Sequence, residues 1–91
     1  MAVNLRKAAE NMPCILCGDT ATTSLHHIRV GQNGGMGKKP PDIHGIEVCR
    51  LHHAYFHSEG INDHKMMLIA YQRQVSRWLE RGLLTVAETN P

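Results

Sequence analysis

Residues 49–57 read CRLHHAYFH, so one cysteine and three histidines lie within nine residues. Two residues separate Cys49 from His52, a spacing that lets two side chains of one turn bind the same metal ion. The segment PCILC contains a cysteine pair with the same spacing. Two such pairs supply the four ligands of a closed, structural zinc site. The sequence therefore predicts zinc bound by Cys14, Cys17, Cys49 and His52, with adjacent His53 as an alternative to His52.

Length and cysteine content agree with this prediction. We expect residues 1–91 to form a single domain, and a domain this small gains much of its stability from a bound metal. Three cysteines cannot all pair in disulfides, which favours reduced thiols and a cytoplasmic location. A redox-active Cys14/Cys17 pair is the alternative, but the sequence around it lacks a thioredoxin-like pattern.

We expect no export or membrane role, because no apolar run has membrane-spanning length. The formal charge of +2 permits nucleic-acid binding without demonstrating it.

The remaining histidines suggest a second metal site. In a helix over residues 49–58, His53 and His57 lie one turn apart, about 100° around the helix from His52. They would offer two imidazoles to an ion with open coordination positions, as hydrolysis requires. His26 and His27 end a predicted strand over residues 22–28, where alternation sends neighbouring side chains to opposite faces. At a strand end, one of them could bind metal and the other accept a proton from water. For His64 we favour an ordinary surface role.

The other elements give an α+β fold. We expect a helix over residues 3–11 and a second strand over residues 43–48. Residues 29–41 form a loop rich in glycine and proline, and we take its Arg29, Lys38 and Lys39 as candidate nucleic-acid contacts. A long helix covers about residues 62–82 with Gly82 as its C-cap. On that helix we expect a solvated stripe of Arg73, Arg77 and Arg81, and a core face of Met67, Leu68, Tyr71, Val75, Trp78 and Leu79.

These motifs together carry a resemblance to a known family. Cys-x-x-Cys, His26-His27-Ile28, a glycine-rich loop and Cys49-x-x-His52-His53-x-x-x-His57 resemble an HNH endonuclease over residues 13–58. LRKAA, HIR, GxGxKPPD and the terminal helix with its Trp resemble the small YbcO-like nucleases of lambdoid prophages. GQNGGMGKKPPD and CRLHHAYFH are also similar to the nuclease domain of the phage recombination-enhancing, RecA-dependent nuclease.

The resemblance implies a ββα-metal (His-Me finger), treble-clef zinc domain with an added N-terminal and C-terminal helix. It also implies hydrolysis of DNA phosphodiester bonds, leaving 5′-phosphate and 3′-hydroxyl ends, in phage or prophage recombination or repair. His27 would be the general base, while His53, with His26 and His57, would bind the catalytic ion, Mg²⁺ or another divalent metal. The middle motif residue, usually Asn, has two candidates: spacing to Cys49 favours His44, whereas the phage relatives favour Asp42.

Two noncatalytic interpretations stay open. The chain could be a zinc-stabilised module of phage origin that binds DNA or a host recombination protein. Alternatively, it could be an interaction protein that forms oligomers through its terminal helix. The sequence contains no recognisable base-reading element, so the form of DNA, and even the choice between DNA and RNA, is not predicted.

Overall fold

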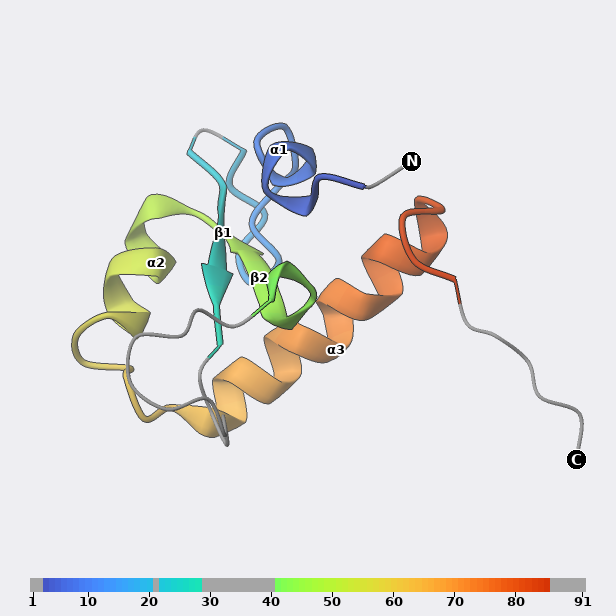
Figure 1. Cartoon of the computed structure of the whole chain (residues 1–91). Coiled ribbons are helices and arrows are strands. Elements are labelled where there is room, and N and C mark those ends of the chain that lie inside the picture. The colour runs from blue at the N-terminus through green and yellow to red at the C-terminus, as the bar shows by residue number, and fades with distance from the viewer. Residues whose placement is uncertain (1–2, 21, 29–40, 86–91) are drawn as a thin grey trace, which may run out of the picture.

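A two-stranded sheet with helices around it makes up the part of the chain that the computed structural model describes, residues 3–20, 22–28 and 41–85 (Figure 1). In chain order the elements are α1 (Leu5–Ala9), β1 (Ser24–His27), the 3-10 helix η1 (Asp42–His44), β2 (Gly45–Val48), α2 (Arg50–Phe56) and α3 (His64–Glu80). The expected α+β class is confirmed.

The register of the sheet separates the two neighbouring histidines of β1. The strands pair antiparallel, with Ser24 opposite Val48, Leu25 opposite Glu47, His26 opposite Ile46 and His27 opposite Gly45. Because side chains alternate along a strand, His26 shares a face with Ile46, and His27 shares the other face with Leu25. The absence of a side chain at Gly45 leaves room for Leu25 on that face, because a β-carbon at position 45 would lie 2.6 Å from Leu25 Cγ.

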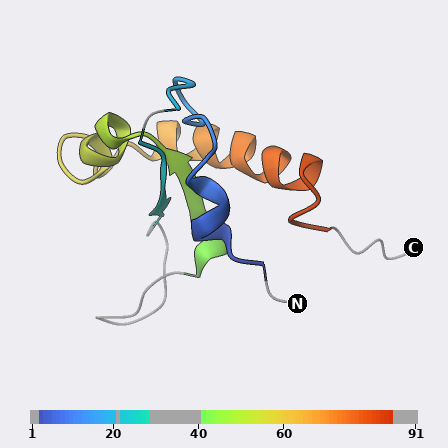
Figure 2. The ribbon, with the colours of Figure 1, turned by 90° about the horizontal axis from the view of Figure 1, so that it is seen from above.

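Each face of the sheet has its own buried cluster of apolar side chains. On the His26 face, Ile46 and Val48 pack with Phe56 of α2 and with Met67 and Ala70 of α3. On the other face the cluster consists of Leu5, Ala9, Leu25 and Trp78. α3 contributes to both clusters, and Figure 2 shows it running behind the sheet with α1 in front. This single long helix therefore links the two faces.

Local capping explains where the helices begin and end. Asn4 Oδ1 accepts a hydrogen bond from the Lys7 backbone at the start of α1, and Asp63 does the same for Met66 at the start of α3. Arg81 is the C-cap of α3, and Gly82 follows it with φ of +72°. Gly82 therefore occupies the position after the C-cap, where a left-handed conformation favours glycine.

Several expected boundaries differ from the structure. The first helix is shorter than residues 3–11, and α3 is shorter than residues 62–82. The second strand begins at Gly45, because Ile43 and His44 belong to η1. No helix in the described part of the chain is long and apolar enough to cross a membrane.

The predicted core face of α3 was partly wrong. Met67 and Trp78 are buried as expected, but Leu68 is 59% exposed and Leu79 is 39% exposed. Ala70 and Gln74, which were not predicted to belong to the core face, are fully buried. The reason is a close approach of α3 to β2, where Gln74 Oε1 accepts a 2.8 Å hydrogen bond from the backbone of Glu47. A small and a polar side chain fit that contact better than leucine does.

The arginine stripe of α3 is also not a simple solvated face. Arg77 Nη1 donates to the Pro13 carbonyl at 2.6 Å and to the buried Glu47 carboxylate at 2.8 Å. Further hydrogen bonds run from Arg73 to the Ile15 carbonyl at 3.5 Å and from Arg81 to the Ala8 carbonyl at 3.4 Å. The stripe therefore attaches the segment around the first cysteine pair to α3.

Candidate metal centres

The four side chains predicted to bind zinc lie together, with one ligand atom from each within 4.8 Å of all the others. Cys14 and Cys17 come from the turn before β1, and Cys49 and His52 come from the first turn of α2. His52 belongs to this cysteine cluster and His53 does not, so the geometry places His52 with the cysteines. We call these four residues the cysteine cluster.

Distances within the cysteine cluster fit a tetrahedral metal ion. Two sulfurs that are each about 2.3 Å from a tetrahedral zinc lie about 3.8 Å apart. Cys17 Sγ and Cys49 Sγ are 3.8 Å apart, and His52 Nδ1 lies 3.4 Å from Cys14 Sγ and 3.3 Å from Cys49 Sγ. The donor set of three thiols and one imidazole therefore fits a closed metal site.

The electrostatics of the cysteine cluster also favour a cation. Burial alone would raise the pKa of Cys14, but backbone hydrogen bonds from Cys17, Cys49 and Leu16 outweigh it and lower that pKa to about 6. At Cys17 a backbone hydrogen bond from Asp19 lowers the pKa, but burial and the neighbouring thiols raise it overall. Like charges this close repel each other, and a bound cation removes the repulsion.

A second cluster consists of His26, His53 and His57, whose ligand atoms also lie within 4.8 Å of one another. We call it the histidine cluster. His53 and His57 lie one turn apart near the end of α2, with ring centroids 4.8 Å apart, and His26 approaches both from β1 at 5.0–5.1 Å. His26 is buried, whereas His57 is exposed. Three imidazoles with one open side fit a metal site that keeps coordination positions free for other ligands.

The surroundings of His53 suit metal binding. Burial lowers the pKa of His53, and the nearby His57 and His27 lower it further, because a second positive charge would be repelled. The neutral imidazole is the form that binds metal. A 3.0 Å hydrogen bond joins His53 Nδ1 to Ser24 Oγ and orients the ring.

His27 lies beside the histidine cluster but has a different partner. On the opposite face of the strand from His26, its Nε2 lies 2.7 Å from Asp42 Oδ1. The hydrogen bond from His27, and secondarily one from Arg6, hold the pKa of Asp42 below its usual value. An ionised carboxylate only accepts hydrogen bonds, so the proton resides on Nε2 of His27. In the neutral ring, Nδ1 is then the nitrogen that carries a free lone pair.

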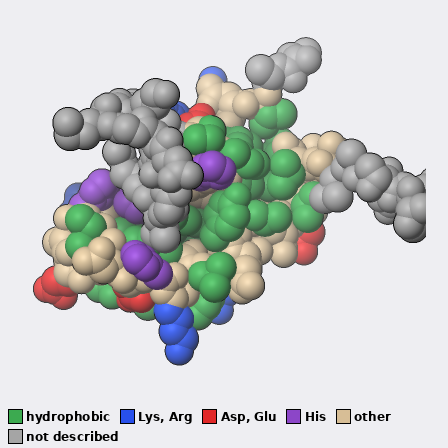
Figure 3. Space-filling view, turned by 60° about the horizontal axis from the view of Figure 1, so that its bottom comes forward, with side chains coloured by type: hydrophobic (Ala, Val, Ile, Leu, Met, Phe, Trp, Pro, Cys, Tyr) green, Lys and Arg blue, Asp and Glu red, His purple; other side chains and the backbone are tan. Residues whose placement is uncertain are grey.

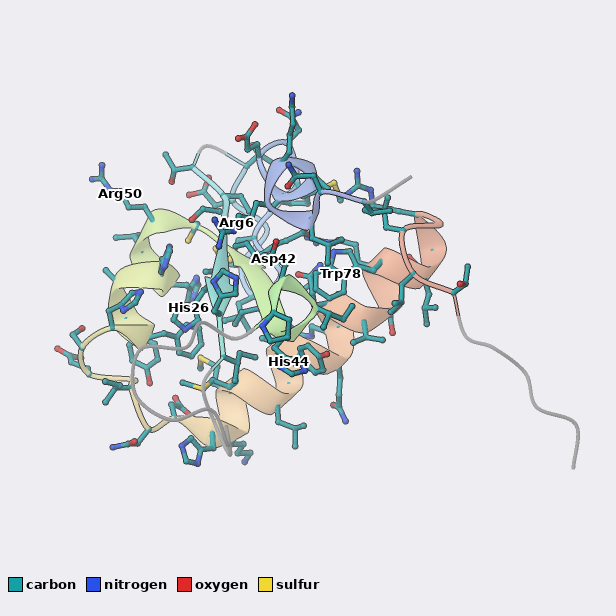
Figure 4. All side chains as sticks on the ribbon, viewed as in Figure 1. Arg6, His26, Asp42, His44, Arg50 and Trp78 are labelled. Atoms are coloured by element: carbon teal, nitrogen blue, oxygen red, sulfur yellow. The ribbon has the colours of Figure 1, made fainter. Side chains whose placement is uncertain are left out.

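The two candidates for the middle motif position differ in placement. Asp42, the first residue of η1, contacts His27, whereas His44, two residues later, is exposed and makes no side-chain hydrogen bond within the described residues. Figure 4 shows both side chains over the sheet, between α2 on the left and α3 on the right. The geometry brings Asp42 to the site. The predicted nucleic-acid contacts Arg29, Lys38 and Lys39 lie outside the described residues.

Pockets adjoin the histidines on two sides. One, of about 430 Å³, is lined by Arg6, Glu10, Ser24, Leu25, His26, His27, His53 and His57. Another, of about 310 Å³, shares His26, His27 and His57 and extends to Asn62 and His64. Figure 3 shows histidine side chains beside an apolar area on the face it presents. The histidine cluster and His27 are therefore accessible from the same pockets.

Two residues of the site were not found from the sequence. Ser24 contacts His53 across 29 positions, and Arg6 Nε donates to Asp42 Oδ1 at 3.2 Å across 36 positions. Ser24 belongs to no motif, and Arg6 lies in LRKAA, a stretch that contributed to the family resemblance without any role for its residues. No signal in the sequence could have assigned them, because both contacts depend on how α1 and α2 pack against the sheet.

One protein-family model matches most of the chain. A family model described as "Protein of unknown function (DUF968)" matches residues 6–81, and this range contains both clusters. The chain belongs to that family. The DUF968 range begins at Arg6, the second residue of α1, and ends at the C-cap of α3, so it includes both strands of the sheet and the helices α2 and α3.

One curated relative shares part of this sequence. A stretch of 52 residues is 38% identical to "Uncharacterized protein YdfU" of Escherichia coli (strain K12), which is 57% of this chain but 15% of that protein. The chain therefore matches a small part of that relative's length. No solved structure matches the chain significantly.

Proposed function

We propose that this DUF968 chain is a metal-dependent endonuclease of the HNH type that hydrolyses DNA phosphodiester bonds. One observation carries the proposal: His27, which is hydrogen-bonded to Asp42, lines the same pocket as the three imidazoles of the histidine cluster. Hydrolysis of a phosphodiester needs a base for water and positive charge beside the phosphate. The pair and the cluster provide groups for both requirements.

We also propose that the cysteine cluster holds a structural zinc ion and that the sheet and α2 form a treble clef around it. The spacing of the four ligand atoms supports this assignment, as does the position of Cys49 at the N-cap of α2. Four protein ligands leave no position for water, so this metal would stabilise the fold without taking part in hydrolysis.

In the proposed reaction His27 accepts a proton from water, and Asp42 orients His27. Asp42 accepts the hydrogen bond from His27 Nε2 and keeps the ring in one orientation and one tautomer. Nδ1 then takes a proton from the attacking water. His26, His53 and His57 would hold a divalent ion, which when bound stabilises negative charge on the phosphate and on the leaving oxygen. A role in phage or prophage recombination or repair rests on the resemblance alone.

A plasmid-nicking assay with His27→Ala and His44→Ala tests the proposal. Both variants lose one imidazole from the same region, but only His27 contacts Asp42. With added Mg²⁺, Mn²⁺ or Ni²⁺ we expect His27→Ala to lose cleavage by about 10²- to 10⁴-fold, the usual contribution of a general base. His44→Ala should stay within a few-fold of the wild type.

Zinc content and circular dichroism of each variant provide the controls for folding. A His27→Ala protein that is folded, contains zinc and still cleaves would show that His27 is not the base. Wild-type protein that binds DNA but does not cleave it with any divalent ion would favour the noncatalytic zinc module instead.

A further inference from the structure

Arg6 of α1 lies in the same pocket as the histidines, although the stretch LRKAA that contains it was given no role in the site. Its side chain is 53% exposed, and its Nε donates a 3.2 Å hydrogen bond to Asp42 Oδ1. The same oxygen lies 2.7 Å from His27 Nε2. Arg6 is therefore adjacent to the proposed base without contacting it directly.

Most of the hydrogen-bonding capacity of Arg6 is unused within the described residues. A guanidinium carries five N–H donors, and the Asp42 contact uses the one on Nε. The donors on the two Nη atoms make no hydrogen bond to any residue of the described segments. Because the side chain is 53% exposed, these donors are accessible to water or to a ligand.

The formal charges of the described lining residues cancel, because Arg6 is the single guanidinium among them and Glu10 the single carboxylate, and the rest are histidines, Ser24 and Leu25. The divalent ion proposed for the histidine cluster would add positive charge. A planar guanidinium with paired donors matches two oxygens of a phosphate.

We propose that the Nη groups of Arg6 bind the non-bridging oxygens of a nucleic-acid backbone phosphate beside His27. This inference rests on the proposed function and extends it, because it makes α1 a part of the substrate-binding site and assigns that part to the phosphodiester group. Arg6 thus holds the substrate while its Nε keeps Asp42 in position.

The packing of α1 holds Arg6 in place. Asn4 caps the helix through the Lys7 backbone at 3.1 Å, and Leu5 and Ala9 are buried against Leu25 and Trp78. Lys7 follows Arg6 on the same helix, is exposed and does not line the pocket. Lys7 is therefore a matched control for loss of one positive charge from α1.

DNA binding separates a phosphate contact from a structural role. We would measure the affinity of the His27→Ala protein for a fluorescent oligonucleotide, without added divalent ion and at several salt concentrations, alone and with Arg6→Gln, Arg6→Lys or Lys7→Gln. Arg6→Gln should weaken binding and reduce the slope of log affinity against log salt by about 1, whereas Lys7→Gln should leave the slope unchanged. Arg6→Lys should keep the slope but bind more weakly, because lysine lacks the paired donors. Equal slopes for Arg6→Gln and Lys7→Gln would overturn the proposal.

Cleavage kinetics separate direct action from action through Asp42. In the otherwise wild-type protein, Arg6→Gln should lower kcat/KM by about 100- to 1,000-fold, as for loss of a donor to a reacting oxyanion. The same factor should appear in an Asp42→Ala background, whereas a factor that vanishes there would mean that Arg6 acts only on Asp42. Binding that depends on Arg6 in a protein without cleavage would retain the phosphate site and reject the nuclease. Cleavage unaffected by Arg6→Gln would retain the nuclease and reject the phosphate site at Arg6.

Discussion

The two ends of α2 are fixed in different ways. At its N-terminal end, Cys49 and His52 join the cysteine cluster, whose ligand atoms have the spacing of a closed metal site. At its C-terminal end, Phe56 is buried in the apolar cluster, and Tyr55 donates a 2.5 Å hydrogen bond to Asp63. The histidine cluster lies on this second end and is open to the pockets.

This contrast indicates a division of tasks along one short helix. Metal at the closed end would hold the fold together, so that the open end needs no metal for its stability. His52 and His53, neighbours in sequence, belong to different clusters because successive helical positions point about 100° apart. Under the proposed function, an ion at the histidine cluster would bind and leave without unfolding the chain. Four predictions test this division, beginning with the largest expected effect.

Loss of the metal from the cysteine cluster should abolish folding. Structural zinc contributes about 10–16 kcal/mol in small zinc domains, which is comparable to the whole stability of a domain. Cys14→Ser should therefore contain no zinc and should lack a cooperative thermal transition by circular dichroism. A Cys14→Ser protein that folds and melts like the wild type would refute the structural role. Chelation of the wild type, followed by refolding on added zinc, is the control for the substitution itself.

Loss of a histidine from the other cluster should affect activity and leave the fold intact. His57→Ala should lower metal-dependent cleavage by more than about 100-fold, since partners outside the first coordination shell alone contribute about 10- to 100-fold. Its zinc content and Tm should stay close to those of the wild type, because His57 is exposed. His44→Ala is the matched control. Unfolding of His57→Ala would remove the distinction between the two ends.

Loss of the Ser24 hydroxyl should have a smaller effect at the same site. The hydroxyl is hydrogen-bonded to His53 Nδ1 at 3.0 Å, and Ser24→Ala should weaken divalent-ion binding by about 10-fold. Titration of cleavage against Mn²⁺ measures this affinity. Ser58→Ala removes a hydroxyl that bonds only to the Ala54 carbonyl near the end of α2, and it should leave the titration unchanged. Equal Mn²⁺ affinities for the two variants would remove Ser24 from the site.

The smallest effect concerns Asp63, which joins the open end of α2 to α3. One carboxylate oxygen caps the Met66 backbone and the other accepts from Tyr55, and an asparagine has only one oxygen to offer. Asp63→Asn should lower Tm by a few degrees at neutral pH, and Asn62→Ala is the control.

The pH dependence of this effect follows from the pKa of Asp63. The hydrogen bond from Tyr55, followed by that from Met66, lowers this pKa. The stabilisation is therefore complete above the unfolded value of about 4 and is lost only as the pH falls through the lower folded value. Between pH 8 and pH 9 the difference in Tm between Asp63→Asn and wild type should stay constant. A difference that changes across this range would contradict the assignment.

The sequence predicted the ligand sets because their spacings are local. Cys-x-x-Cys, Cys-x-x-His and the one-turn interval between His53 and His57 reflect the geometry of a single turn or helix, which residue types alone indicate. Helical periodicity also separated His52 from His53 and His57, whereas the assignment of His26 rather than His27 to the second metal came only from the family resemblance.

Contacts between distant segments could not be predicted in this way. The choice between Asp42 and His44 depended on η1, a turn of 3-10 helix where the residue pattern favoured a strand. The burial of Gln74 in place of Leu68 depended on how closely α3 approaches β2. Arg6 reaches Asp42 only because α1 packs against the sheet, and no periodicity describes that contact.

The arginines of α3 have a consequence for the order of events during synthesis. Arg73, Arg77 and Arg81 hold the carbonyls of Ile15, Pro13 and Ala8, which leave the ribosome about 60–70 residues earlier. All the cysteine and histidine ligands also emerge before these arginines. A nascent chain can thus gather both sets of metal ligands while its first segment is still unattached. Its final closure must await translation of α3.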